Sequence, residues 1–491
     1  MQTLEKSIFP FIICFFNPLE YIWHTSDNAF QTMLRLRPII LLFLFVQVLH
    51  TAAQSQTSYV FWKDDVSLRK RYFDESMQKR QTVLAASPKQ YAKDYKEIYQ
   101  HQFDEIGDLW NSTRPVTAPE VNNYLQSIVK KIIDANPELQ NTDARIVFTR
   151  DDWPNAASMG DGSIAINGGL LIFLNNEAEL AFVICHELSH YYLDHTNKQI
   201  KKIVELYNSE NFTKEVKRLS KQQYGAGKEF DELMKRMAFG SRHHSRENEA
   251  EADRQAFLFM KNTAYDCHEI LSCLQLLDKV DDSAIYKPLV PETVFNFDEY
   301  PFRKKWVQKE SVLFGAMTND ASPFTQAEKD SLKTHPDCAI RIALLQDSVK
   351  KLPQGKKFLV DENFFYRIKK EFFPEITEQE FRNDNLAKNL YYSLLMLQNG
   401  DATSMTIYSV TRDLNILFQR QKEHTLGDIE KESRNYPADY NLLLRMIDRL
   451  RLDELASINY YFCRKYEAQM TGDNGFAEEK RKAQKDFSEY K

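Results

Sequence analysis

Two histidines and a glutamate in the segment His186-Glu187-Leu188-Ser189-His190 have the spacing of a metal site. On a helix, residues four apart lie one turn apart on the same face, so both imidazoles can bind one ion. Glu187 lies beside them. In zinc hydrolases a glutamate at this place takes a proton from the attacking water and passes it to the leaving amine. The motif predicts a hydrolytic zinc site, and the alternative is a core helix with surface histidines.

A catalytic zinc usually has three protein ligands and an open fourth position, so a third ligand is needed. His195 is close in sequence. However, a metzincin requires a glycine and a histidine at the third and sixth positions after the second motif histidine, where this chain has Leu193 and Thr196. We therefore expect His195 to be a helix-end histidine near the negative pole of the helix dipole, and not a ligand.

An acidic segment downstream offers a better third ligand. Glu249 and Asp253 lie four residues apart, and on a helix they share a face. Glu249 is predicted to bind the metal, and Asp253 to accept the free ring N–H of a ligand histidine and so fix its tautomer. The alternative is an acidic face in water, because Glu247 and Glu251 flank the pair.

The residues around the first motif predict a small sheet. The segment from Ala144 to Thr149 is rich in β-branched and aromatic residues, and Ser163 to Ile166 predicts a second strand after a turn at Gly160 to Gly162. Before them, apolar residues at helical spacing predict an amphipathic helix over Ala118 to Ile133. These elements, with the helices below, predict an α+β fold that is mostly α.

Two helices must carry the motifs. The first is predicted to begin at Asn176, with Glu179 completing a capping box, and its apolar residues should bury it. The second is predicted to begin near Ser245, a good N-cap. Between them, the charged segment from Lys198 to His244 reads as a helical insertion.

The rest of the chain is predicted to be helical. Residues from Ser55 to about Asn111 lead into the helix over Ala118 to Ile133. Beyond about Pro353 the pattern is almost purely helical, with a leucine stripe that stops at Asn399-Gly400. These C-terminal helices could form degenerate tetratricopeptide-like pairs, although no clean repeat is visible. We expect a leader over residues 1–53, a catalytic domain over 54–352 and an all-helical region over 353–491.

The beginning of the chain resembles an export signal. From Met33, a basic opening is followed by an apolar run from Ile39 to Leu49 and by small residues at Ala52 and Ala53. The run is about half of the roughly 20 residues that cross a bilayer, which favours a cleaved signal over an anchor. We expect translation to start at Met33, and the mature protein to have no integral membrane span and to be exported to the periplasm, the envelope or the outside of the cell.

Composition excludes some other classes. The net charge is −6, and 64 basic residues are interspersed with 70 acidic ones, so nothing indicates a nucleic-acid partner. The six cysteines do not form the pattern of a disulfide scaffold. Cys267 and Cys273 would pair only if a helix breaks between them.

The chain resembles the HtpX-like and CAAX-prenyl-protease-like zinc metallopeptidases, peptidase family M48. The resemblance covers nearly half of the sequence and rests on ordered motifs: Asn155-Ala156, Gly162, Ile164 to Ile166, Gly169-Leu170-Leu171, Glu177 to Leu180, Glu249 to Asp253, Thr334-His335-Pro336 and Arg341-Ile342. Two departures, Gly160-Asp161-Gly162 in place of Pro-Gly-Gly and Ser189 in place of glycine, do not touch a ligand position.

The resemblance implies a gluzincin-type (zincin) catalytic domain with one Zn²⁺ bound by His186, His190 and Glu249. It also implies that Asn155 and Ala156 lie on the edge strand of the cleft, where a substrate adds as an extra strand. For Asn155 the alternative is an ordinary turn residue. His335 matches a family histidine that could stabilise the tetrahedral intermediate or occupy the open zinc position, and a structural cap is the alternative.

The long segment between His190 and Glu249 contains no transmembrane run, which resembles the soluble exported branch of the family. The expected function is therefore a zinc metalloendopeptidase that hydrolyses peptide bonds in exported or envelope proteins, in protein quality control. Its C-terminal helices would dock substrates or envelope partners. The alternative from another class is a non-catalytic, zinc-containing assembly or chaperone module.

Overall fold

The computed structural model describes residues 60–219, 246–281, 287–308, 338–433 and 436–490. The predicted leader, the start at Met33, the N-cap at Ser245 and His335 lie outside these residues. Contacts divide the chain into two units, residues 1–55 with 210–233 and residues 56–209 with 234–491. In the first unit the structure describes α9 (Glu210–Leu219). All elements discussed below belong to the second unit.

Helices make up most of the described chain, and four strands form one sheet, so the predicted α+β, mostly α class is confirmed. None of the helices in the described ranges is both long and apolar enough to cross a membrane. The N-terminal half contains α3 (Val66–Ala85), α4 (Ala92–Asn111), α5 (Pro119–Ala135), η2 (Pro137–Leu139), α6 (Gly168–Phe173), α7 (Glu177–Tyr192) and α8 (His195–Tyr207).

A further helix includes residues 246–261. After it come α11 (Glu269–Asp281), α12 (Pro291–Phe295), η3 (Lys304–Trp306) and α14 (Cys338–Val349). The C-terminal region contains α15 (Glu362–Arg382), α16 (Leu386–Gln398), α17 (Ser404–Lys422), η4 (Leu426–Asp428), α18 (Ala438–Arg449), α19 (Leu452–Tyr466) and α20 (Asn474–Tyr490).

The sheet has the strand order β1-β2-β4-β3, with β1 (Pro115–Val116), β2 (Arg145–Thr149), β3 (Ala156–Ser158) and β4 (Ser163–Asn167). The central strands β2 and β4 are parallel, with Arg145 opposite Ser163, whereas β1 and β3 are antiparallel edge strands. Both central strands were predicted, and the turn before β4 has positive φ at Gly160 and Gly162, a conformation that glycine tolerates.

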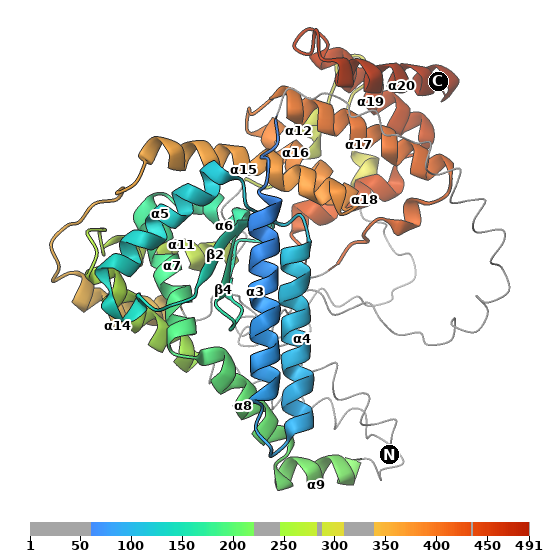
Figure 1. Cartoon of the computed structure of the whole chain (residues 1–491). Coiled ribbons are helices and arrows are strands. Elements are labelled where there is room, and N and C mark those ends of the chain that lie inside the picture. Colours follow the sequence, from blue (N-terminus) through green and yellow to red (C-terminus); the bar gives the residue numbers. More distant parts are fainter. Residues whose placement is uncertain (1–59, 220–245, 282–286, 309–337, 434–435, 491) are drawn as a thin grey trace. The chain divides into compact units, whose positions relative to one another are not determined.

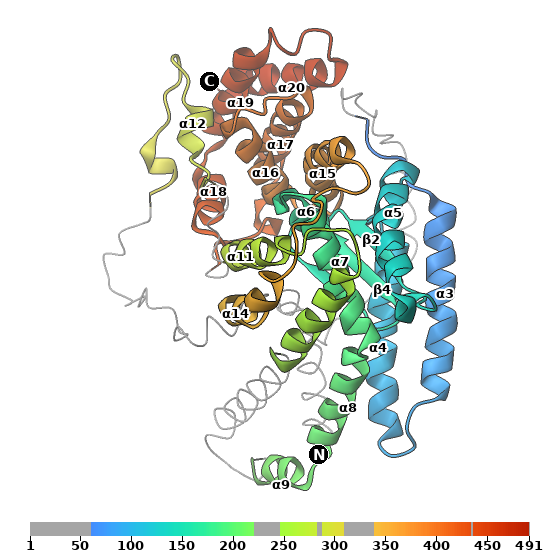
Figure 2. The same ribbon diagram turned by 90° about the vertical axis from the view of Figure 1, so that its left-hand side faces the viewer.

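Helices cover both faces of the sheet, which explains why β2 is buried along its whole length. Ile146 and Phe148 point into a core shared with α5 and α7, whereas Val147 points the other way, against Phe103 and Trp110 of α4. Figure 1 shows α3 and α4 side by side, and Figure 2 shows α7 beside the sheet. The sheet is therefore an inner layer between helices, and the backbone groups along its edge strand β3 are not covered by another strand of the described chain.

Two large hydrophobic cores each combine segments that lie far apart in the sequence. The first joins α5, the sheet, α7 and α11 to four residues of α15, including Phe365 and Phe372. The second joins residues 289–307 to α16, α17, α18, α19 and α20. The helical C-terminal region and the end of the leucine stripe, where Gly400 has a φ of 91°, agree with the sequence analysis. The division of the chain at residues 352 and 353 stays a prediction.

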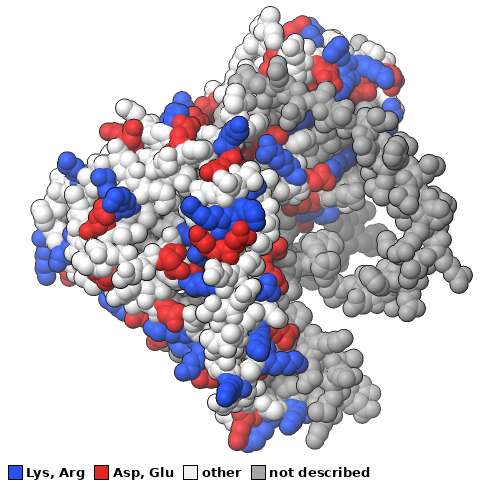
Figure 3. Space-filling view, viewed as in Figure 1, with Lys and Arg blue, Asp and Glu red and all other residues white. Residues whose placement is uncertain are grey.

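Charges on the face seen in Figure 3 are mixed, with Lys and Arg interspersed among Asp and Glu. The five cysteines in the described ranges form no disulfide, and all are buried: Cys185, Cys267, Cys273, Cys338 and Cys463. Cys267 lies before α11 and Cys273 lies within it, so the helix begins between them. The two thiols are nevertheless unpaired.

Candidate metal centre

The helix α7 is buried along nearly its whole length, which holds the motif histidines rigidly. The predicted N-cap is confirmed, because Asn176 Oδ1 accepts the backbone N–H of Glu179 at 3.0 Å. The predicted reciprocal bond is different: Glu179 Oε2 accepts the backbone N–H of Asn175 at 2.5 Å. The carboxylate thus satisfies the donor one residue before the cap, so the capping box prediction was half wrong.

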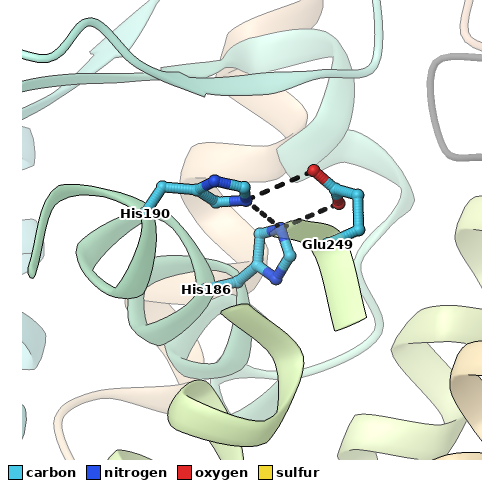
Figure 4. Close-up of side chains that lie close together, drawn as sticks. All are labelled: His186, His190 and Glu249. Atoms are coloured by element: carbon cyan, nitrogen blue, oxygen red, sulfur yellow. Dashed lines mark hydrogen bonds and ion pairs between the residues drawn. The ribbon is translucent and has the colours of Figure 1, made fainter. Parts of the chain in front are cut away.

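His186, His190 and Glu249 bring their ligand atoms together at one point (Figure 4). The two Nε2 atoms lie 3.1 Å apart, and each lies 3.3 Å from an oxygen of Glu249. In a tetrahedral zinc site with bonds of about 2.0–2.1 Å, neighbouring ligand atoms are about 3.3 Å apart. The distances between the three ligand atoms therefore match those of such a site, and the residues fit a zinc ion.

The electrostatics of these residues also fit a cation. Burial lowers the pKa of His186, but the close contacts with the carboxylates of Asp253 and Glu249 and their charges outweigh it and raise the pKa to about 10. Burial also opposes ionisation of Glu249, yet the two histidines hold its pKa well below the usual range. The carboxylates of Glu249 and Asp253 are stabilised by positive charge, and a divalent cation beside Glu249 would provide it.

Asp253 lies behind His186, one turn after Glu249. Its Oδ1 lies 2.9 Å from His186 Nδ1, although off the direction of an in-line hydrogen bond. The same carboxylate accepts two hydrogen bonds from Arg341 on α14, from Nε at 2.6 Å and from Nη2 at 2.8 Å. Arg341 Nη1 also lies 3.5 Å from Glu249. The guanidinium thus links the metal-facing carboxylate to the one behind His186.

His195 is absent from the ligand cluster, as expected, but its predicted setting was wrong. α7 ends at Tyr192, and Asp194 adopts a left-handed conformation with a φ of 57°. His195 is consequently the first residue of α8, at the positive end of that helix dipole. Its ring is buried, with Nδ1 lying 3.0 Å from His190 Nδ1 and Nε2 lying 3.2 Å from Glu251. Burial and the neighbouring His190 lower the pKa of His195.

A cavity of about 210 Å³ opens beside the three clustered side chains. Glu187 lines it, as do the other two residues that the family resemblance places in the cleft, Asn155 and Ala156. Apolar walls come from residues of α6, α7 and α11, namely Leu170, Phe182, Val183 and Leu277. The candidate base and the end of an edge strand therefore share one cavity with the ligand cluster.

The strand β3 turns half of its backbone groups away from the sheet. Asn167 N–H donates to Asn155 O, and Met159 N–H donates to Ser163 O, both at 2.9 Å. Because bonding direction alternates along an antiparallel strand, the N–H and C=O groups of Ala156 and Ser158 face away from β4. These groups are available to a peptide that adds at the edge.

Sequence reasoning missed three contacts of the site. The Arg341-Ile342 pair was noted as part of a motif, but nothing in the local sequence placed Arg341 against Asp253, 88 residues away. Glu251 was named only as a flanking residue of the alternative acidic face, and the spacing of five residues from His190 to His195 gave no sign that the two rings touch. His335 and Thr334 lie outside the described residues.

Residues 119–349 match the family model for peptidase family M48. No curated protein matches the chain. The matched segment contains the strands β2, β3 and β4, both motif helices and Arg341.

Proposed function

We propose that this chain is a metalloendopeptidase with one zinc ion held by His186, His190 and Glu249, because residues 119–349 match the model of peptidase family M48, whose members are zinc-dependent metallopeptidases. The observation that carries the proposal is the convergence of these three side chains at zinc-like spacing in a cavity that Glu187 also lines. A purely structural zinc site would not need a general base beside it.

His186, His190 and Glu249 would hold the zinc ion, which would supply a Lewis acid for the scissile carbonyl and for the attacking water. Glu187 follows His186 directly on α7 and faces the cavity, so it can accept the proton of the attacking water and pass it to the leaving amine. Asp253 and Arg341 hold His186 and Glu249 in place from behind. For His335, which lies outside the described residues, the resemblance implies one of two roles, stabilising the tetrahedral intermediate or occupying the open zinc position, and a structural cap is the alternative.

The substrate is proposed to bind as an extended strand along β3. The outward backbone groups of Ala156 and Ser158 would pair with main-chain groups of the peptide, a mode that tolerates many sequences. The apolar wall that includes Phe182 and Leu277 favours an apolar side chain next to the scissile bond.

The natural substrates are proposed to be exported or envelope proteins that are misfolded or unassembled. Support comes from the signal-like run after Met33 and from main-chain binding, which suits substrates of varied sequence. The C-terminal helices α16 to α20 would dock such proteins or an envelope partner.

The test compares the purified wild type with Glu187→Gln, measuring zinc per chain and casein cleavage. We expect about one zinc in both proteins and a loss of cleavage of about 10²- to 10⁴-fold in the variant, because the base is lost while the ligands remain. Glu205→Gln, an exposed carboxylate on α8, is the matched control and should retain activity. A wild type that binds zinc but cuts nothing, also after His335→Ala, would favour the non-catalytic module.

A further inference from the structure

The two ligand histidines have different supports behind their rings. His186 has its carboxylate, Asp253, in direct contact and almost fully buried. Behind His190 lies a second imidazole, His195, and only beyond it a carboxylate, Glu251, whose side chain is 49% exposed. The chain of contacts runs from His190 Nδ1 to His195 Nδ1 at 3.0 Å and from His195 Nε2 to Glu251 Oε2 at 3.2 Å.

With Glu251 ionised and both imidazoles neutral, hydrogen-bond donors and acceptors allow one proton arrangement in this chain of contacts. An ionised carboxylate only accepts, so His195 Nε2 must carry a hydrogen. In a neutral imidazole the other nitrogen then has the lone pair, so His195 Nδ1 accepts and His190 Nδ1 must donate. His190 Nε2 is left without a hydrogen, and this is the atom that faces His186 and Glu249.

We propose that His195 and Glu251 are positioning residues, which fix the tautomer and ring orientation of His190 through two successive hydrogen bonds and so prepare Nε2 to bind the metal. The inference rests on the proposed zinc site. Glu251 would support His190 as Asp253 supports His186. Because Glu251 does not reach the ring of His190, the imidazole of His195 connects the two.

The geometry of the chain explains how His195 reaches this place. The left-handed turn at Asp194 separates α7 from α8 and returns the next residue against the last turn of α7. The ring of His195 is 4% exposed, so water cannot readily replace it as the acceptor for His190. Removing it leaves a buried donor without a partner.

Zinc affinity is the first measurement, by competition with a chelator on the full chain. His195→Phe should weaken zinc binding about 10- to 100-fold, because it keeps the ring volume and removes the acceptor. His195→Asn should recover part of the loss, since its side-chain oxygen can accept from His190. Glu251→Lys should weaken binding at least about tenfold, because an ammonium donates to His195 Nε2 and reverses both tautomers.

Glu247→Lys is the matched control, because it makes the same charge change at an exposed position of the same helix. It should change zinc affinity by less than about twofold, which separates tautomer control from charge repulsion. The ¹⁵N shifts of the two imidazoles give a direct second measurement: wild type should show His190 protonated at Nδ1 and His195 at Nε2, and Glu251→Lys should reverse His195.

Thermal unfolding of the metal-free variants checks that each is folded. The proposal is overturned if folded His195→Phe binds zinc as wild type does, if Glu251→Lys and Glu247→Lys weaken binding equally, or if the imidazole shifts show the opposite tautomers. None of these measurements depends on peptide cleavage. A protein that binds zinc through this chain of hydrogen bonds but cuts nothing would contradict the proposed function alone.

Discussion

The buried charges behind the metal centre are stabilised by pairing with each other. Asp253 is 2% exposed and Arg341 is 4% exposed, so neither charge is stabilised by water. The guanidinium and the nearby His186 hold the pKa of Asp253 low despite its burial. The bidentate contact therefore stabilises the folded protein only while both partners are present.

Asp253→Asn should lower the free energy of unfolding of the metal-free protein by about 3–5 kcal/mol, because it leaves the buried Arg341 charge poorly compensated. Urea unfolding followed by circular dichroism measures this. Asp74→Asn is the control, since Asp74 pairs with Lys70 at an exposed position and should cost no more than about 1 kcal/mol. Equal losses in the two variants would contradict the role assigned to the buried pair.

In the edge strand β3, the backbone groups that bond to the sheet differ from those that a substrate could bind. Alternation along the strand points the N–H of Ala156 away from β4 and the N–H of Ala157 toward it. The backbone groups of Ala157 therefore bond to the sheet, whereas those of Ala156 face the cleft.

Ala156→Pro should leave the protein folded and able to bind zinc, because proline is tolerated at the first residue of an edge strand. Peptide cleavage should fall about two- to tenfold in kcat/KM, the amount expected from one lost main-chain hydrogen bond. Ala157→Pro is the comparison and should instead lower thermal stability, since it removes a bond within the sheet. If Ala156→Pro cleaves peptides as wild type does, substrates do not pair with this strand.

Contacts between distant parts of the chain join the loop before the edge strand to the C-terminal helices. Tyr392 on α16 donates to Asp152, in the loop between β2 and β3, at 2.6 Å, and Lys388 lies 3.7 Å from the same carboxylate. Glu380 on α15 is buried close by, and burial together with the charge of Asp152 raises its pKa to about 7. This loop leads directly into the edge strand.

The raised pKa of Glu380 predicts the direction of a pH effect on stability. Between about pH 4.3, where the unfolded carboxyl titrates, and about pH 7, the folded protein holds a proton that the unfolded chain has released. The free energy of unfolding therefore falls as pH rises through this window. Glu380→Gln cannot ionise, and its side-chain oxygen can still accept from Asn385.

We expect Glu380→Gln to be more stable than wild type by about 1–3 kcal/mol at pH 8 and to show little difference at pH 4. Urea unfolding across this pH range measures the difference. Glu362→Gln, exposed at the start of the same helix, should show no such trend. A constant difference between Glu380→Gln and wild type at all pH values would contradict the raised pKa.

The sequence by itself determined the elements whose signals are local. The N-cap at Asn176, the strands β2 and β4, the turn at Gly160 to Gly162 and the helix α5 follow from short patterns of capping, β-branched and apolar residues. The cluster of His186 and His190 with Glu249 was also expected, because helical spacing places two ligands on one face and a recognisable motif supplied the third.

Only the tertiary structure decided the contacts that support these residues. Arg341 reaches Asp253 across 88 residues of chain because α14 packs in the same core, and α15 joins that core while residues 289–307 join the other. The position of His195 depended on the left-handed conformation of Asp194, which ends α7 and begins α8. His195 therefore lies at the start of α8 and not at the end of α7. Local patterns specify helices and strands, but partners distant in the chain are set by packing.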